Sequence, residues 1–540
     1  PPTTTTTNPD TIENTLTTIW QQTLHLNHIN PYDNFLDLGG DSLAAIRVAA
    51  LARTRGIVLP AHAVLRADSL AALAERARRI PDCGSRTPPV TVADRPSGAG
   101  VEVPLLPMQH AFFGRRRPDP NWANLAGLFL LPGESLDVAR LRGALVATSG
   151  RHEALRVRFQ RVGDRWSQQL GADPAVALDV APPIAGAMSA QDVARSAGEW
   201  QRSLDITAGP LVRLVIMPGS VTGAQALIVA HHLIMDGWSW QLFLDDLASA
   251  YADPDSFAAS NSAATVPYST WATLLAERAG DAQSAAEAGY WSDLPLSEVT
   301  PVPRDRPDGA NTAGLAESVV RRLDTTATAR LAGSTLGGRR VTALEMLITA
   351  FAAAYRRWTG AGLQALRVLH HGRDAMPDVD ATRTVGWLAA DYPLVLETLI
   401  DEPSKLLSAV RDQMRAVPRS GCGYGVLRHL GPDIMTRARL QAQPTPEVNF
   451  NYLGSQDTLG PDPGRWTTVP ETVPGRFSPD ESRGSVLQIR AVVHRQRLSL
   501  DLQYSRAIHQ RQTVEALADG FVDAVHGILA QAETPPTGSR

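Results

Sequence analysis

Residues 225–239 read QALIVAHHLIMDGWS, and this stretch decides how the rest of the chain is interpreted. The apolar run at 226–230 is typical of a buried strand, and it is followed at once by His231 and His232. Imidazole is the side chain whose unperturbed pKa suits proton transfer near neutral pH. Two adjacent histidines are, by themselves, interpreted as a satisfied core pair or an incidental metal ligand. The stretch therefore predicts a strand that ends in a loop carrying either structural histidines or a general base.

Strand-like and helical runs alternate on both sides of this stretch, from residue 103 to near the C-terminus. This pattern predicts an α/β fold. About 430 residues exceed the usual size of one core, so we expect two lobes with an interface between them. The proline-containing segment 300–312 is the expected crossover between them. The expected strands are 126–131, 211–217, 226–230 and 490–493, and the expected helices are 241–251 and 342–358.

The N-terminal part of the sequence, by contrast, shows helical patterns. Apolar residues from Ile12 onward recur at helical spacing, a second helix is expected at 42–55 with Gly56 as its C-cap, and Ser69 is an expected N-cap. About 70 residues in short helices cannot enclose a catalytic cleft, so a small docking module is expected. The predicted organisation is a linker at 1–10, a helical domain at 11–80, a linker at 81–102, and a domain at 103–535 with lobes at about 103–299 and 300–535.

Composition narrows the class of protein. Hydrophobic residues make up 44% and charged residues 20%, which is typical of a folded globular chain. The net charge of −4 gives no electrostatic case for nucleic acid or anionic membrane as a partner. Two cysteines, Cys83 and Cys422, cannot form a disulfide framework, and no signal peptide or long apolar run is present. These observations predict a cytoplasmic protein.

The stretch 37–43, DLGGDSL, carries the first resemblance. Two glycines allow a tight turn, and Ser42 stands at a helix start, where serine is usually only a cap. The whole string, within a helical unit of this size, resembles the phosphopantetheine attachment motif of peptidyl carrier proteins in nonribosomal peptide synthetases. The resemblance implies that Ser42, preceded by Asp41, takes a 4'-phosphopantetheine arm that carries an aminoacyl or peptidyl thioester.

The histidine stretch carries the second resemblance. His231, His232, Asp236 and Gly237 reproduce the HHxxxDG motif of the condensation superfamily, whose relatives include chloramphenicol-acetyltransferase-like acyltransferases. The resemblance implies a two-lobed α/β domain in which His232 is the catalytic base and Asp236 orders the loop. No metal site is expected, because no Cys or carboxylate stands at ligand spacing from the pair.

Four further segments resemble the epimerisation type of this superfamily. Together they imply that His232, Arg373, Asn451 and Tyr452 surround the α-carbon of the thioester, which the domain inverts. The segments are 107–113 (PMQHAFF), 383–387 (RTVGW) with Tyr392-Pro393 after it, 418–425 (PRSGCGYG) and 448–454 (VNFNYLG).

One segment departs from the family. Residues 369–374, LHHGRD, align with the family's EGHGRE, whose first Glu is its second acid/base residue. His371 and Arg373 match, but Leu369 replaces the Glu and cannot move a proton. His370 is no obvious substitute, since neighbours on a strand face opposite sides.

Three functions therefore stay open. The first is epimerisation, and the second is another His232-dependent reaction on the tethered acyl group, such as condensation, cyclisation, elimination or hydrolysis. The third is a degenerate domain that docks the carrier or recruits a partner. The resemblance implies as partners an upstream adenylation domain, a downstream condensation or release domain, and a phosphopantetheinyl transferase, in the assembly of a secondary metabolite.

Overall fold

The computed structural model describes most of the chain. The described residues are 11–24, 26, 28–35, 38, 40, 42–59, 63–64, 67–79, 98–131, 136–182, 190–217, 225–259, 266–333, 335–336, 339–376, 378–455, 466–469, 473 and 475–531. The expected linker at 1–10, most of the expected linker at 81–102, and Asp41 lie outside these residues.

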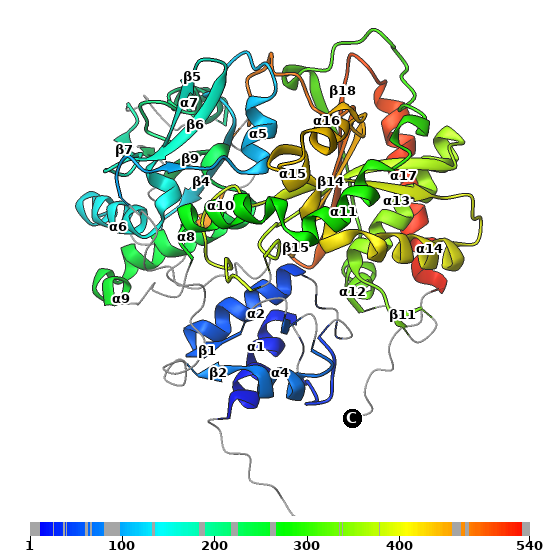
Figure 1. The fold of residues 1–540 in the computed structure, drawn as a ribbon, viewed down its shortest axis with the longest axis horizontal. Helices are drawn as coiled ribbons and strands as arrows, with labels where there is room; N and C mark the ends of the chain where they lie inside the picture. Colours follow the sequence, from blue (N-terminus) through cyan, green and yellow to red (C-terminus); the bar gives the residue numbers. More distant parts are fainter. Residues whose placement is uncertain are drawn as a thin grey trace, which may run out of the picture.

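The N-terminal unit is a small helical bundle beside a two-lobed body (Figure 1). Its core is built around Trp20 and Phe35, whose rings meet edge to face at 4.9 Å. Ser69 caps the last helix by accepting a hydrogen bond from the amide of Ala72, as predicted, and Gly56 has the left-handed backbone expected at a helix end. The elements are α1 (Ile12–Leu24), α2 (Ser42–Thr54), α4 (Leu70–Arg76) and a two-stranded ribbon of β1 (Ile57–Val58) with β2 (Arg78–Arg79).

The first lobe is a five-stranded sheet with helices on both faces. The order is β16-β4-β9-β8-β7, with one parallel pair, β7 with β8. Helices α6 and α8 cover one face and α7 covers the other, because apolar side chains of the strands point both ways. The central elements are β4 (Asn124–Leu130), β7 (Val176–Val180), β8 (Val212–Met217), β9 (Gln225–His231), α6 (Val138–Arg151), α7 (Ala190–Arg202) and α8 (Gly237–Ala252).

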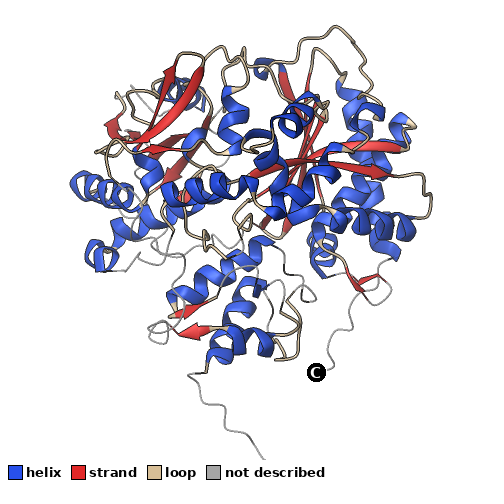
Figure 2. Cartoon of the chain, viewed as in Figure 1, coloured by secondary structure: helices blue, strands red, loops and turns tan. Residues whose placement is uncertain are grey.

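The second lobe is a six-stranded sheet of order β10-β18-β17-β15-β13-β14. Long helices α13 and α17 pack against one face only, so its strands alternate between apolar and polar residues (Figure 2). The elements are β10 (Ala316–Arg322), β13 (Leu363–His370), β14 (Ala390–Glu397), β15 (Val448–Ser455), β17 (Leu487–His494), β18 (Arg497–Ser505), α12 (Thr325–Gly333), α13 (Ala343–Thr359), α14 (Pro403–Ala416) and α17 (Arg511–Gln531).

The two lobes exchange segments where they meet. Strand β16 (Thr467–Thr468), late in the sequence, pairs with β4 of the first lobe. Apolar residues of segments 375–376 and 379–388, together with Cys422, also join the first lobe's core. The other elements are β3 (Glu102–Val103), β5 (Val157–Val162), β6 (Arg165–Leu170), α5 (Pro107–Phe113), α9 (Pro254–Ala259), α10 (Tyr268–Glu277), α11 (Ala282–Ser292), β11 (Thr335–Leu336), β12 (Arg339–Arg340), α15 (Cys422–His429) and α16 (Ile434–Ala442).

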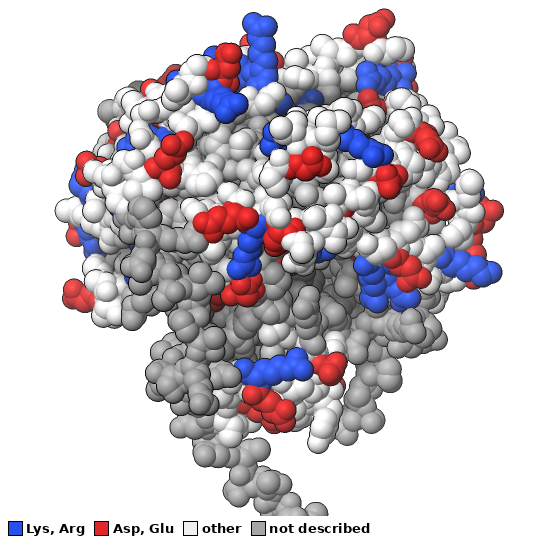
Figure 3. All heavy atoms as spheres, viewed as in Figure 1, with Lys and Arg blue, Asp and Glu red and all other residues white. Residues whose placement is uncertain are grey.

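The predicted strands and helices lie within a few residues of the observed ones, and the predicted fold class is confirmed. Among the described residues, no helix is long and apolar enough to cross a bilayer. On the face drawn in Figure 3, acidic and basic side chains are interspersed and do not form a patch of one sign.

Candidate active site

His231 ends strand β9 and holds the loop that follows it. Its ring is buried, its Nε2 lies 2.9 Å from the carbonyl oxygen of Pro120, and its Nδ1 accepts a hydrogen bond from the amide of Leu233 at 3.1 Å. Nδ1 is therefore unprotonated and Nε2 carries the proton. Burial lowers the pKa of His231 to about 3, so the ring is neutral. With both nitrogens occupied, His231 has no free atom for a substrate.

His232 is placed differently. Its backbone amide donates to the carbonyl of Ala123 at 2.7 Å, and its ring packs on Trp387 with centroids 4.3 Å apart. The residue is half-buried, and its Nδ1 is enclosed without a hydrogen-bond partner. Burial lowers the pKa of His232 to about 4, which keeps the imidazole neutral at pH 7. The geometry leaves Nε2 as the ring nitrogen able to accept a proton from a bound molecule.

Asp236 organises this loop and is fully occupied. Its Oδ1 accepts a hydrogen bond from the amide of Ser239 at 2.8 Å. Asp236 thereby caps helix α8, whose first residue is the exposed Gly237. Its Oδ2 accepts from the amides of Leu388 and Ala389, both at 3.0 Å. The pKa of Asp236 is lowered: burial alone would raise it, but the guanidinium of Arg373 and these hydrogen bonds outweigh that effect.

Arg373 is the charged partner of Asp236 and does not reach out to a substrate space. Its Nη1 and Nη2 lie 3.1 and 3.2 Å from the two carboxylate oxygens, and Nη2 also donates to Ser239 and Thr384. The side chain is buried. The structure thus gives Arg373 a part in joining residues 370–389 to the histidine loop.

Gln109, on α5, is a positioning residue that the sequence analysis did not single out. Its amide nitrogen donates to the carbonyl of Leu233 at 2.8 Å and to the hydroxyl of Tyr268 at 2.9 Å, and its oxygen accepts from the amide of Leu106 at 2.8 Å. The side chain is fully buried. The sequence signal that could have identified Gln109 was its position within the segment 107–113, where most neighbours are apolar. A glutamine buried among such residues needs hydrogen-bond partners.

The face of the second sheet opposite α13 and α17 is polar. Strand register places side chains from β13, β14, β15, β17 and β18 on this face, where they are half-buried or buried. Asn451 lies on this face, whereas Tyr452, the next residue, is on the other side and packs against the apolar core. The structure therefore does not bring Asn451 and Tyr452 together. The polar face carries Arg367, Asp391, Asn449, Asn451, Arg490 and Asp501, together with Leu369.

Residues 369–374 leave β13 and turn. His370 lies on the face opposite to Leu369, as strand alternation predicts. The Nδ1 of His371 accepts from the amide of Arg373 at 3.1 Å, and its Nε2 is enclosed without a partner. Gly372 has φ +72°, and a Cβ there would lie 1.8 Å from the carbonyl oxygen of Leu388, so only glycine fits.

His370, Asp374 and Cys422 form a separate group. The Sγ of Cys422 lies 3.4 Å from Nδ1 of His370 and 3.5 Å from Oδ1 of Asp374, and these ligand-type atoms are close enough to hold one metal ion. No metal site was expected from the sequence, because no Cys or carboxylate stands at ligand spacing from the histidine pair. Cys422 begins helix α15 and lies 52 residues after His370 in the sequence. Residue spacing along the chain therefore does not predict this group.

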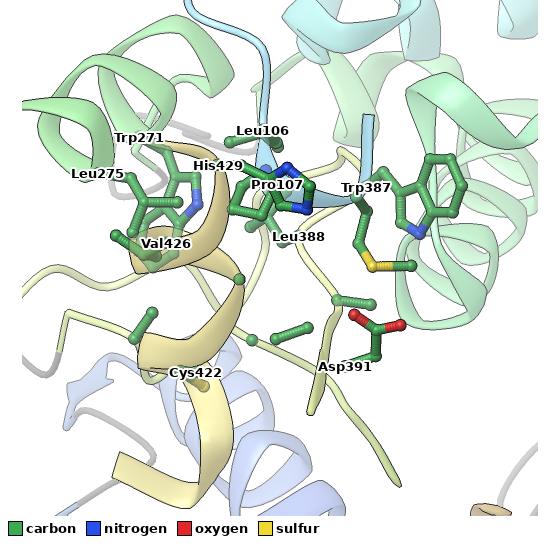
Figure 4. Close-up of a pocket in the computed structure, with 16 residues that line it drawn as sticks. Leu106, Pro107, Trp271, Leu275, Trp387, Leu388, Asp391, Cys422, Val426 and His429 are labelled. Atoms are coloured by element: carbon green, nitrogen blue, oxygen red, sulfur yellow. The ribbon is translucent and has the colours of Figure 1, made fainter. Parts of the chain in front are cut away.

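A pocket opens between the lobes, next to Trp387 (Figure 4). Trp387 is the residue whose ring packs on His232. It is formed where α5, α10 and α15 meet residues 387–391. Trp387 and Asp391 line one side and Cys422 and His429 the other (Figure 4). Asp391 is a candidate functional residue that sequence reasoning missed.

Ser42, the expected attachment residue, is the first residue of α2. A helix start favours phosphate, because its amides are free and the helix dipole is positive there. Gly40, two residues earlier, has no room for a side chain, since a Cβ would lie 2.3 Å from the Phe35 ring. These features fit a phosphodiester-linked arm on Ser42, which would supply the thiol that carries the acyl group.

Comparisons with known proteins agree with this geometry. The model of the phosphopantetheine attachment site matches residues 14–77, and the condensation-domain model matches residues 100–537. Linear gramicidin synthase subunits B and C of Brevibacillus parabrevis are 33% and 31% identical to the chain over 98% of its length. The chain spans only 10% and 7% of these two relatives.

Solved structures share the fold of the second domain. The epimerization domain from the third module of tyrocidine synthetase B superposes with a TM-score of 0.73 at 25% identity, covering 81% of this chain and 98% of that one. The condensation domain of Monacolin K polyketide synthase gives a TM-score of 0.63 at 18% identity, covering 80% and 98%, a likeness of fold alone. The chain belongs to the condensation-domain family and joins such a domain to a nonribosomal peptide synthetase carrier domain with a phosphopantetheine attachment site.

Proposed function

We propose that the condensation-type domain inverts the α-carbon of an aminoacyl or peptidyl thioester carried on Ser42. The observation that carries this proposal is His232, a neutral imidazole with one free ring nitrogen at the junction of the lobes. The higher TM-score with the tyrocidine epimerization domain supports epimerisation over condensation.

In this function the carrier corresponds to residues 11–80 and the epimerising domain to residues 103–535. The core of the helical unit supports the first boundary, because its buried members run from Leu16 to Ala77. An adenylation domain would load the carrier, a condensation or release domain would take the product, and a phosphopantetheinyl transferase would modify Ser42.

The pantetheine arm supplies the thioester, which makes the α-proton acidic enough to remove. His232 accepts that proton at Nε2, because its lowered pKa keeps the ring unprotonated. His231 and Asp236 hold the loop so that this nitrogen stays in place. Return of a proton to the opposite face completes the inversion.

The test is to load the carrier with an L-aminoacyl-pantetheine from its coenzyme A derivative and a broad phosphopantetheinyl transferase, in deuterated water. Deuterium at the α-carbon and D-amino acid after hydrolysis are the expected results. Ser42→Ala is the loading control and should gain no arm. A loaded protein that keeps both its α-proton and its configuration would exclude epimerisation.

A second function has one observation in its favour. Leu369 stands where the resemblance implies a catalytic Glu, and a single base at His232 could serve condensation, cyclisation, elimination or hydrolysis. Mass spectrometry of the same loaded protein separates these reactions, since each gives a different product mass. A docking domain without catalysis would give no change in mass or configuration.

A further inference from the structure

Asp391 and Leu369 are direct cross-strand neighbours. Strands β13 and β14 are antiparallel, and their register places Leu369 opposite Asp391. Directly opposed residues point to the same face of a sheet, with Cβ atoms about 5 Å apart. A carboxylate is therefore present on this face, one strand away from the position where the resemblance implies a Glu.

The surroundings of Asp391 suit a group that meets a substrate. It lines the pocket beside Trp387 (Figure 4). The ring of Trp387 also packs on the ring of His232. Its side chain is 24% exposed, and the nearest cationic group recorded, Nε of Arg367, is 3.5 Å away. Such a contact keeps the carboxylate in place without enclosing both oxygens.

Other carboxylates near the lobe junction are engaged by neighbouring groups or lie outside the pocket lining. Both oxygens of Asp236 are occupied, and Oε1 of Glu481 pairs with Arg117 at 2.6 Å, while Oε2 of Glu481 is buried with no partner among the described residues and lies outside the lining. Asp374 lies against Cys422 and His370, away from the face of Leu369. Among the described residues that line the pocket, Asp391 is the one carboxylate.

We propose that Asp391 is the second acid/base of the epimerisation, in the place of the Glu that Leu369 has displaced. The inference rests on the proposed function. Neutral His232 takes the α-proton of the L-aminoacyl group at Nε2, breaking the Cα–H bond and forming N–H, while the electron pair moves to the thioester oxygen. The protonated carboxyl group of Asp391 then gives its proton to the opposite face of Cα as the electron pair returns, and His232 releases one proton to solvent while Asp391 regains one.

The decisive variant is Asp391→Asn, which keeps shape and removes the proton-transfer group. With the carrier loaded with the L-aminoacyl group in deuterated water, formation of the D-isomer should fall about 10²- to 10⁴-fold. Loading and melting temperature should stay close to wild type. The control Asp378→Asn changes a carboxylate that pairs with Arg278 on the surface and should leave exchange unchanged.

A position swap separates a catalytic role from a structural one. Leu369→Glu combined with Asp391→Leu keeps one carboxylate on this face and should restore the inversion lost in Asp391→Leu alone. Inversion at the wild-type rate in Asp391→Asn overturns the assignment of Asp391 but leaves epimerisation standing. Absence of exchange in loaded wild type overturns the proposed function, and Asp391 then has no reaction to serve.

Discussion

Asp236 and Arg373 join the two lobes through a two-point ion pair whose side chains are only 5% and 1% exposed. The carboxylate also accepts backbone hydrogen bonds from Leu388 and Ala389, so one side chain fixes the histidine loop against the segment that carries Trp387. Since Trp387 packs on His232, the pair holds in place a segment that contacts the proposed base.

Arg373→Ala should be strongly destabilising. It leaves the carboxylate of Asp236 buried without its counter-charge, and breaking a buried pair in this way costs about 3–5 kcal/mol. Urea unfolding of the condensation-type domain measures the loss. The matched control is Arg321→Ala, which breaks an exposed pair with Asp519 and should cost no more than about 1 kcal/mol. Equal losses for the two variants would mean that the buried pair contributes no more than a surface one.

The two neighbouring histidines should behave in opposite ways. His232→Ala should abolish α-exchange with little change in melting temperature, because the ring makes no hydrogen bond through Nδ1. His231→Ala should lower stability by about 1–3 kcal/mol, because it leaves the half-buried Pro120 carbonyl and the buried Leu233 amide without partners. Exchange rates and unfolding curves of both variants provide the comparison. Undiminished exchange in His232→Ala would remove the base from the mechanism.

Stability should fall as the solution becomes acidic, in part through His231. Its pKa is near 6.5 when unfolded and about 3 in the fold, where burial disfavours the charged ring. Between these values the unfolded chain binds more protons, so this contribution is complete above about pH 6.5 and is lost as pH falls toward 3. Each such group changes the free energy of unfolding by about 1.4 kcal/mol per pH unit in that window. His231→Asn should show a shallower slope between pH 6 and about 4, and an unchanged slope would contradict this origin.

The sequence predicted those parts of the site that depend on contiguous residues. The continuous apolar run at 226–230 located the end of β9, and motif spacing placed His232 directly after it. The Asp236–Arg373 pair joins positions 137 residues apart, and periodicity carries no information about such contacts. Asp391 was missed for a related reason: its position opposite Leu369 depends on the register of two strands, which follows from tertiary packing. Side-chain alternation along a strand correctly predicted that His370 and Leu369 face opposite sides of the sheet. The same rule, applied to Asn451 and Tyr452, predicts that these two neighbours also face opposite sides.

Gln109 offers the last prediction, because it links the helix that opens the domain to the loop that holds the base. Gln109→Met fills similar volume but leaves the carbonyl of Leu233 and the amide of Leu106 buried without partners, at a cost of about 1–3 kcal/mol. Leu233 follows His232 directly, so its carbonyl fixes the backbone that orients the ring. Exchange should therefore fall even at a temperature where the variant is fully folded, while loading of Ser42 stays normal.

The control for this variant is Tyr268→Phe, which removes one partner of Gln109 but leaves the contact with Leu233. It should retain most of the exchange activity at a comparable loss of stability. The imidazole chemical shifts of His232 give a readout that a purely structural role would leave unmoved: Gln109→Met should change them and Tyr268→Phe should not. If both variants lose stability but keep wild-type exchange and unshifted imidazole signals, Gln109 supports the fold without positioning the base.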